Sequence, residues 1–146
     1  MKSKHHSLAA AARFHGHLGP WLALGLKAGL RARRELAASP FQLFARVYCP
    51  AKPPHSCFLD GVQFGSGCTL GKGNIRHVRA DGCRLEFIRN GHGGQRRAGD
   101  RLILDLRREV WEELHDGRED GWAAGARLGR QIYRRPFEAL FGVHRR

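Results

Sequence analysis

Two histidines flank a glycine in the stretch Phe14 to Trp21, FHGHLGPW, and their spacing limits how they can act together. On an α-helix, residues i and i+2 point roughly 200° apart, so His15 and His17 do not converge on one object there. A bent backbone lets them converge, and Gly16 allows a bend at no steric cost. Pro20 suits the first position of a helix that follows. We therefore predict a sharp corner that displays two imidazoles ahead of a helix.

Two cysteines lie in short segments that hold most of the other unusual residues, Cys57 in SCFLDG and Cys68 in GSGCTLGKGN. Thiolate and imidazole are ligands that zinc and similar transition ions prefer, so His15, His17, Cys57 and Cys68 form a candidate metal site. The spacing is not diagnostic, because the chain has no Cys-x-x-Cys pair. The alternative stays open that both cysteines are buried small residues and that the histidines cap backbone carbonyls.

The glycine-rich segment GSGCTLGKG is superficially similar to a phosphate-binding P-loop. Its first required glycine falls on Ser66, and Gly73 follows Lys72 where a serine or threonine should bind magnesium, so we reject that interpretation. The glycines around Lys72 still allow an anion-binding nest.

Apolar periodicity, with glycine and proline as boundaries, indicates the elements that must position these residues. Gly25 and Gly29 share one face of the helix expected after Pro20 and let another backbone approach closely. Asp81-Gly82 and the glycine-rich segment 91–99 predict hairpins that make the last three strands antiparallel. Helices are expected at 7–14, 20–38, 56–64, 108–117, 120–135 and 136–142, and strands at 41–49, 74–80, 83–90 and 100–107.

These elements predict an α+β fold, a small antiparallel sheet packed against helices in a single domain over residues 1–146, with residues 1–6 as a flexible tail. The chain has no run of about 18 apolar residues, and its start lacks the uninterrupted apolar segment that a signal peptide needs, so we expect a cytoplasmic protein without a membrane span. In that compartment the four cysteines serve metal, redox or packing roles rather than disulfides, and Cys49 and Cys83 are expected to be packing residues.

The charge is strongly basic, with 26 lysines and arginines against 13 aspartates and glutamates and a formal net charge of +13. Basic proteins attract polyanions, and nucleic acid is the usual one. The arginines are spread along the chain, and aromatic residues do not interleave with them as a single-strand stacking surface requires. We interpret them mainly as a solvated surface, and nucleic-acid binding remains the less favoured alternative.

The motif FHGHLGPWLALGLKAGL, followed by CFLDGVQFGSGCTLGKGNI, resembles the formylmethanofuran dehydrogenase E-subunit family and its stand-alone relatives. The ending RRPFEALFGV is also similar to a short closing helix of that family, so the resemblance spans Phe14 to Val143. It implies an α+β core domain, often dimeric, with a metal pocket where the histidine corner meets the cysteine block. Two departures are that Gly19 stands where many members have cysteine, and that the zinc-finger domain many members append does not follow here.

By position, the resemblance assigns His15 and His17 to the histidine pair, Cys57 to the first cysteine and Cys68 to the second. The polar residues that match between and after them are Asp60, Gln63, Thr69 and Lys72. The implied cofactor is a divalent transition metal, zinc first, with nickel or iron as alternatives. Cys68 is a fourth ligand, a resolving thiol for Cys57 or a core residue.

Asp60 and Lys72 are the candidate catalytic residues. Asp60 follows Cys57 by one helical turn, so it can orient a ligand or act as a general base, or be a plain helix-surface carboxylate. Lys72 can hold a substrate carboxylate or phosphate beside the metal, or be a solvated loop lysine.

Two classes of function remain. One is a metal-dependent small-molecule enzyme or an accessory domain in one-carbon or redox metabolism, acting on a small anionic substrate. The other is a basic, homodimeric binding module whose metal is structural or a cargo, and which docks on a redox complex or a polyanion. The pterin and iron–sulfur centres of the family's parent complex do not fit this chain, because four cysteines without ferredoxin spacing cannot hold such clusters.

Overall fold

The computed structural model describes residues 7–90, 97–115 and 121–146, so the expected tail at 1–6 and most of the turn at 91–99 lie outside the described residues. The helices are α1 (Leu8–His15), α2 (Pro20–Glu35), α3 (Cys57–Ser66), α4 (Arg108–His115), α5 (Trp122–Arg134) and α6 (Phe137–Leu140), with a 3-10 turn η2 (Leu70–Lys72). The strands are β1 (Leu43–Cys49), β2 (Ile75–Arg79), β3 (Arg84–Arg89), β4 (Arg101–Leu106) and β5 (Phe141–Arg145). Among these residues, no helix combines the length and apolarity needed to cross a bilayer.

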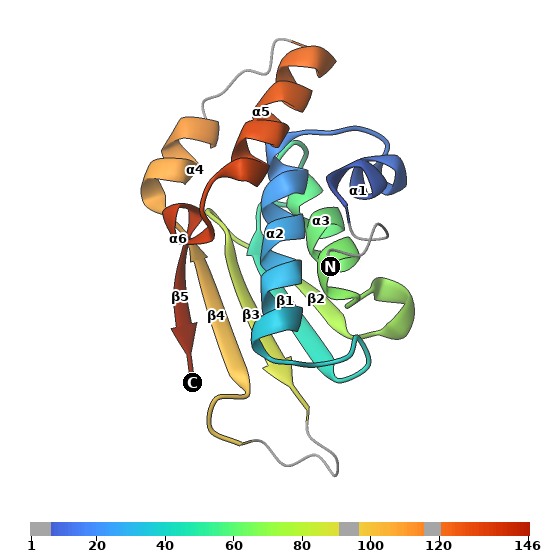
Figure 1. Cartoon of the computed structure of the whole chain (residues 1–146), viewed down its shortest axis with the longest axis vertical. Helices are drawn as coiled ribbons and strands as arrows, with labels where there is room; N and C mark the ends of the chain where they lie inside the picture. Colours follow the sequence, from blue (N-terminus) through green and yellow to red (C-terminus); the bar gives the residue numbers. More distant parts are fainter. Residues whose placement is uncertain (1–6, 91–96, 116–120) are drawn as a thin grey trace.

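The fold is a single α+β domain, as expected, in which α2 and α3 lie side by side across one face of a five-stranded sheet (Figure 1). In β1 the residues alternate between buried and partly exposed, and its buried side chains join those of α2 and α3 in one core. On the opposite face of the sheet, charged side chains of neighbouring strands lie next to one another. There Glu86 lies between Arg46 and Arg101, with closest nitrogen–oxygen distances of 3.6 and 2.6 Å.

The sheet order, β2-β1-β3-β4-β5, corrects the predicted pairing of the strands. The prediction of a hairpin at Asp81-Gly82 is wrong, because β2 pairs in parallel with β1. The turn instead carries the chain past the end of β1 to β3, which pairs with the other edge of β1. The most apolar strand, β1, takes an interior position where both its edges are paired, and burial there outweighs the local turn signal. The segment from β1 through α3 to β2 is the crossover that a parallel pair requires.

The end of the chain also differs from the prediction of a helix at 136–142. The helix is limited to α6, and β5 follows it and pairs antiparallel with β4. Phe141 is fully buried opposite Leu106, and Arg146 and Arg101 exchange backbone hydrogen bonds of 2.8 and 2.9 Å. Pairing the free edge of β4 satisfies backbone groups that a longer helix would leave open.

Glycines bring the backbones of α2 and α3 into direct contact. A Cβ atom on Gly25 would lie 2.1 Å from the carbonyl oxygen of Phe58, and one on Gly61 would lie 2.3 Å from the carbonyl oxygen of Leu22. Further along, Gly29 faces Gly65 in the same way. The predicted close approach at Gly25 and Gly29 is confirmed, and the contacts pair early residues of α2 with early residues of α3. The two helices therefore run in the same direction, and their N-termini lie at the same end of the molecule.

We predict that Gly25→Ala destabilises the protein by about 3 kcal/mol, because the overlap with the Phe58 carbonyl outweighs the ~1 kcal/mol that alanine gains over glycine in a helix. Urea unfolding followed by circular dichroism measures this. The matched control is Gly71→Ala, since a Cβ there meets nothing within 4 Å, and we expect a change within about 0.5 kcal/mol. Equal stabilities of the two variants would contradict the packing argument.

Candidate metal centre

The corner predicted from FHGHLGPW forms at the junction of α1 and α2. Ser7 caps α1 by accepting a hydrogen bond from the Ala10 amide, and His15 is the last residue of that helix. Gly16 ends α1 with φ at 110°, in the left-handed region where glycine is favoured. His17 therefore leaves the helix direction, and Pro20 starts α2 three residues later. The bend removes the divergence that an i, i+2 pair would have on a helix.

Three ligand groups meet where this corner reaches the start of α3. The ligand atoms of His15, His17 and Cys57 all lie within 4.8 Å of one another. The two Nε2 atoms of the histidines are 3.1 Å apart, and Cys57 Sγ is 4.0 Å from His17 Nε2. Tetrahedral zinc with ordinary bond lengths separates two nitrogen ligands by about 3.3 Å and a nitrogen and a sulfur ligand by about 3.6 Å. The donor set and its spacing fit one such ion.

Asp60 fixes the orientation of His15. Its Oδ2 accepts a hydrogen bond from His15 Nδ1 at 2.5 Å, and the side chains are 39% and 11% exposed, respectively. With the proton on Nδ1, the lone pair of Nε2 faces His17 and Cys57. A carboxylate on the far nitrogen of a histidine is the usual support of a metal-ligating imidazole, because it holds both the tautomer and the ring plane. Of the two roles considered for Asp60, this contact favours orientation of a ligand.

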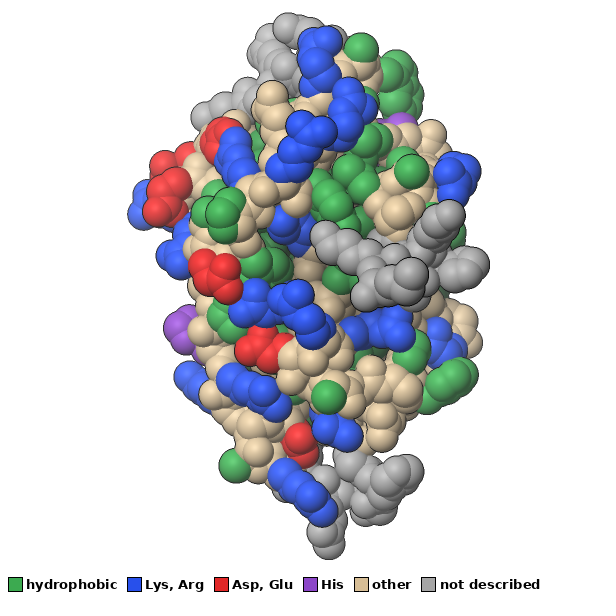
Figure 2. Space-filling view, in the orientation of Figure 1, with side chains coloured by type: hydrophobic (Ala, Val, Ile, Leu, Met, Phe, Trp, Pro, Cys, Tyr) green, Lys and Arg blue, Asp and Glu red, His purple; other side chains and the backbone are tan. Residues whose placement is uncertain are grey.

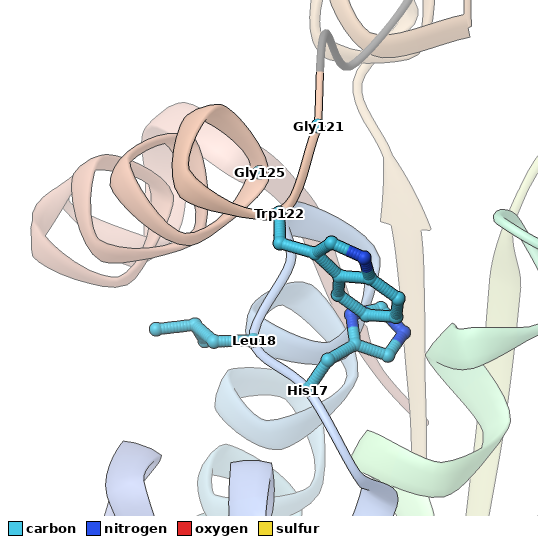
Figure 3. A pocket seen from close by; sticks show the side chains of 5 residues that line it. All are labelled: His17, Leu18, Gly121, Trp122 and Gly125. Atoms are coloured by element: carbon cyan, nitrogen blue, oxygen red, sulfur yellow. The ribbon is translucent and has the colours of Figure 1, made fainter.

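Sequence reasoning missed Trp122, the first residue of α5, which packs against His17. The ring centres are 4.7 Å apart and the planes meet at 81°, an edge-to-face contact. Figure 3 shows the indole lying over the imidazole, with Leu18 pointing away from both. His17, Leu18, Gly121, Trp122 and Gly125 line a pocket of about 230 Å³ at this point. The pocket therefore shares His17 with the metal cluster.

A glycine again sets the position of the element that carries this tryptophan. A Cβ on Gly129 would lie 2.9 Å from the carbonyl group of Gly19, so α5 packs directly on the backbone of the corner. Gly125 is buried one turn earlier. The spacing of Gly125 and Gly129 repeats that of Gly25 and Gly29, and this repeat was the available signal that α5 packs closely on another backbone.

The structure does not bring Cys68 or Lys72 to the cluster. Cys57 is the first residue of α3 and Cys68 follows its end, so nearly the whole of this ten-residue helix, about 15 Å long, lies between them. Cys68 is fully buried, and this burial raises the pKa of its thiol. Lys72 is exposed in η2 and donates from Nζ to Thr69 Oγ1 at 2.9 Å. Four of the six proposed site residues thus meet: His15, His17, Cys57 and Asp60.

Polar residues of α3 and of the segment after it hold the loop between α3 and β2 rather than the cluster. Gln63 Oε1 accepts from the Leu70 amide, and Asn74 Oδ1 accepts from the Thr69 amide. Thr69 Oγ1 in turn accepts from the Lys72 amide and caps η2. These hydrogen bonds hold the chain between α3 and β2 in a defined path.

The remaining described cysteines and a second histidine pair are not members of the cluster. Burial raises the pKa of Cys49 to about 12. The pKa of Cys83 is also raised, mainly by burial and to a smaller extent by the nearby Cys49. Both are packing residues of the core, as predicted. His115, to which sequence reasoning gave no role, lies with its Nδ1 3.1 Å from His55 Nε2 and stacks on Trp111. Burial, and then the charge of His115, lowers the pKa of His55.

We predict that one thiol of the native, metal-free protein reacts rapidly with a chromogenic disulfide reagent at about pH 8. With a pKa of about 12, Cys49 is a thiolate in only about one molecule in ten thousand there, and burial raises the pKa of Cys68 and Cys83 as well. Cys57 is only 9% exposed, but it is the first residue of α3, and a helix N-terminus stabilises a thiolate. Cys57→Ser should abolish the rapid phase, and unfolding should expose all remaining thiols. Rapid reaction of two or more thiols in the folded protein would contradict this assignment.

Comparison with known proteins identifies the family of this chain. Residues 14–142 match the FmdE family, described as FmdE, molybdenum formylmethanofuran dehydrogenase operon. One curated relative, from Archaeoglobus fulgidus, is described as a probable S-adenosyl-L-methionine-binding protein. It is 32% identical over 89 residues, which cover 56% of this chain and 23% of that protein. The chain thus matches less than a quarter of the relative's length. Since the family match extends from the histidine corner to β5, the chain belongs to the FmdE family.

Proposed function

We propose that His15, His17 and Cys57 bind one divalent transition ion, zinc first, with nickel or iron as alternatives, and that the bound ion is the functional group of this domain. The observation that carries the proposal is the meeting of three ligand atoms within 4.8 Å, one of them on an imidazole whose other nitrogen is bonded to Asp60. The parallel N-termini of α2 and α3 add partial positive charge at this end of the fold, which favours an anionic ligand there.

Three protein ligands leave one position of a tetrahedral ion open, which is how catalytic sites differ from closed structural ones. When bound, the ion supplies a Lewis acid for an oxygen-containing ligand. The chain's own residues do the rest: Asp60 holds the ring of His15, while Trp122 and Leu18 form the walls of the pocket beside His17. Lys72 is too far along the fold from this cluster to hold the anionic end of a substrate there.

The family's link to formylmethanofuran dehydrogenase supports a role in one-carbon or redox metabolism, which we propose to be that of a cytoplasmic accessory domain. Its substrate would be a small anionic or carbonyl compound, and a homodimer is the assembly the resemblance implies. The name of the archaeal relative concerns a protein of which the match covers 23%, so we do not extend its S-adenosylmethionine to this chain.

A second candidate is a binding module that docks on a polyanion or a redox complex. Arg46 and Arg76 lie directly opposite each other on β1 and β2, and since Glu86 already pairs with Arg46, Arg76 is the charge of the two that an acidic partner would neutralise. Figure 2 shows lysine and arginine spread over the viewed face of the molecule rather than gathered in one patch. This distribution favours a solvated surface, so the metal site remains the first proposal.

Element-resolved mass spectrometry of untagged protein prepared without chelators tests the proposed site. We expect about one metal ion per chain. His17→Ala should lower this to a small fraction, whereas Lys72→Ala, which alters an exposed side chain away from the cluster, should leave it unchanged. Equal metal content in wild type and His17→Ala, or none in wild type after reconstitution under reducing conditions, would reject the site.

The variant Asp60→Asn tests whether Asp60 supports metal binding by His15 or only contributes to the fold. The amide retains the shape but accepts the Nδ1 proton less strongly, so we expect a roughly 10- to 100-fold weaker metal affinity with full stoichiometry at saturation, within the range for such supporting partners. Competition with a chromogenic chelator measures the affinity. Unchanged affinity would show that the His15 contact does not support the ion.

The alternative role predicts its own salt dependence. Binding of a model polyanion such as heparin should weaken steeply with ionic strength, and Arg76→Ala should reduce the slope of log affinity against log salt. Binding that is absent even at low salt would remove this candidate.

A further inference from the structure

Trp122 is an exposed aromatic side chain at a site where exposure is unusual. It is 73% exposed although its ring is in edge-to-face contact with that of His17, one of the three residues of the metal cluster. Exposed large apolar groups close to a polar cluster are typical of places where a ligand or partner covers them. The side chain sits on the first residue of α5, and the Gly129 contact with Gly19 holds that helix against the corner.

The pocket beside this indole is open because two of its five lining residues are glycines. Gly121 and Gly125 contribute no side chains, and Leu18 contributes an apolar wall. His17 lines the same pocket while its Nε2 belongs to the cluster with His15 and Cys57. No acidic side chain lines the pocket among the described residues. A molecule that occupies the pocket therefore contacts the indole of Trp122 and the imidazole of His17, one of the three residues of the metal cluster.

We propose that this pocket binds a small molecule with a single flat ring and a metal-chelating oxygen head group, the ring packed on Trp122 and the head directed to the open position of the cluster. The inference rests on the proposed metal site and adds its substrate class. The volume of about 230 Å³ lies below the ~300–1,000 Å³ of pockets for drug-sized ligands, so one ring with a short head group fits and a dinucleotide does not. Trp122 is then the residue that determines specificity.

A pair of hydroxamates tests this assignment on the cobalt-substituted protein, since both chelate metal through the same two oxygens and only one carries a ring. The visible spectrum of bound cobalt reports chelation. We expect benzohydroxamate to bind about tenfold more tightly than acetohydroxamate to the wild type, in line with the stacking contribution of an aromatic side chain. Trp122→Ala should bring the ratio close to one while cobalt stoichiometry and acetohydroxamate affinity stay unchanged.

Two further variants make the result specific to the indole. Trp122→Phe keeps a ring and should retain most of the preference, which also guards against a fold defect in the alanine variant. Phe41→Ala removes another exposed aromatic side chain, 83% exposed and not among the pocket residues, and should leave the ratio as in the wild type.

The outcomes distinguish this proposal from the one on which it rests. Cobalt binding with equal affinities for the two hydroxamates, or a preference that survives in Trp122→Ala, overturns the ligand class and leaves the metal site intact. Failure of the wild type to bind cobalt overturns the metal site and the ligand class together.

Discussion

The direct backbone contact between α2 and α3 governs how every other part of this fold is placed. Four glycines, Gly25 and Gly29 on one helix and Gly61 and Gly65 on the other, allow an approach that any side chain would prevent. Because the helices run in the same direction, the corner before α2 and the first residue of α3 lie at one end. His15, His17 and Cys57 meet for this reason, although His17 and Cys57 are 40 positions apart in the sequence.

The same device positions the third part of the site. Gly129 lets α5 rest on the carbonyl of Gly19, and Trp122, two turns earlier on that helix, lies against His17. A bulkier side chain at Gly129 would move α5 and its tryptophan away from the cluster without touching a ligand atom. The geometry of the pocket is thus set by backbone packing, while its chemistry is set by the side chains that the packing brings together.

The electrostatics of the fold make Asp60 distinctive. In this basic chain, the ion pairs of the described carboxylates otherwise join them to arginines, as with Glu35 to Arg31, Glu113 to Arg135 and Glu86 to Arg101. Asp60 instead bonds to the imidazole of His15. A guanidinium holds its charge under all ordinary conditions, whereas an imidazole offers its second nitrogen as a ligand. The pairing therefore leaves a donor atom of His15 directed at the ion.

The corner could be predicted from the residues alone, because Gly16 and Pro20 impose local backbone geometry and the i, i+2 spacing excludes convergence on a helix. The α+β class, the donor types and the close approach at Gly25 were predictable for the same reason, since all are local properties. Long-range packing was needed to pair β2 in parallel with β1 despite Asp81-Gly82, and to turn the last residues into β5. Packing also separated Cys68 and Lys72 from the cluster, since α3 extends between them and Cys57, and it added Trp122. Those outcomes depend on which strands bury most apolar surface and on the directions of packed helices, and neither is encoded in the spacing of residues along the chain.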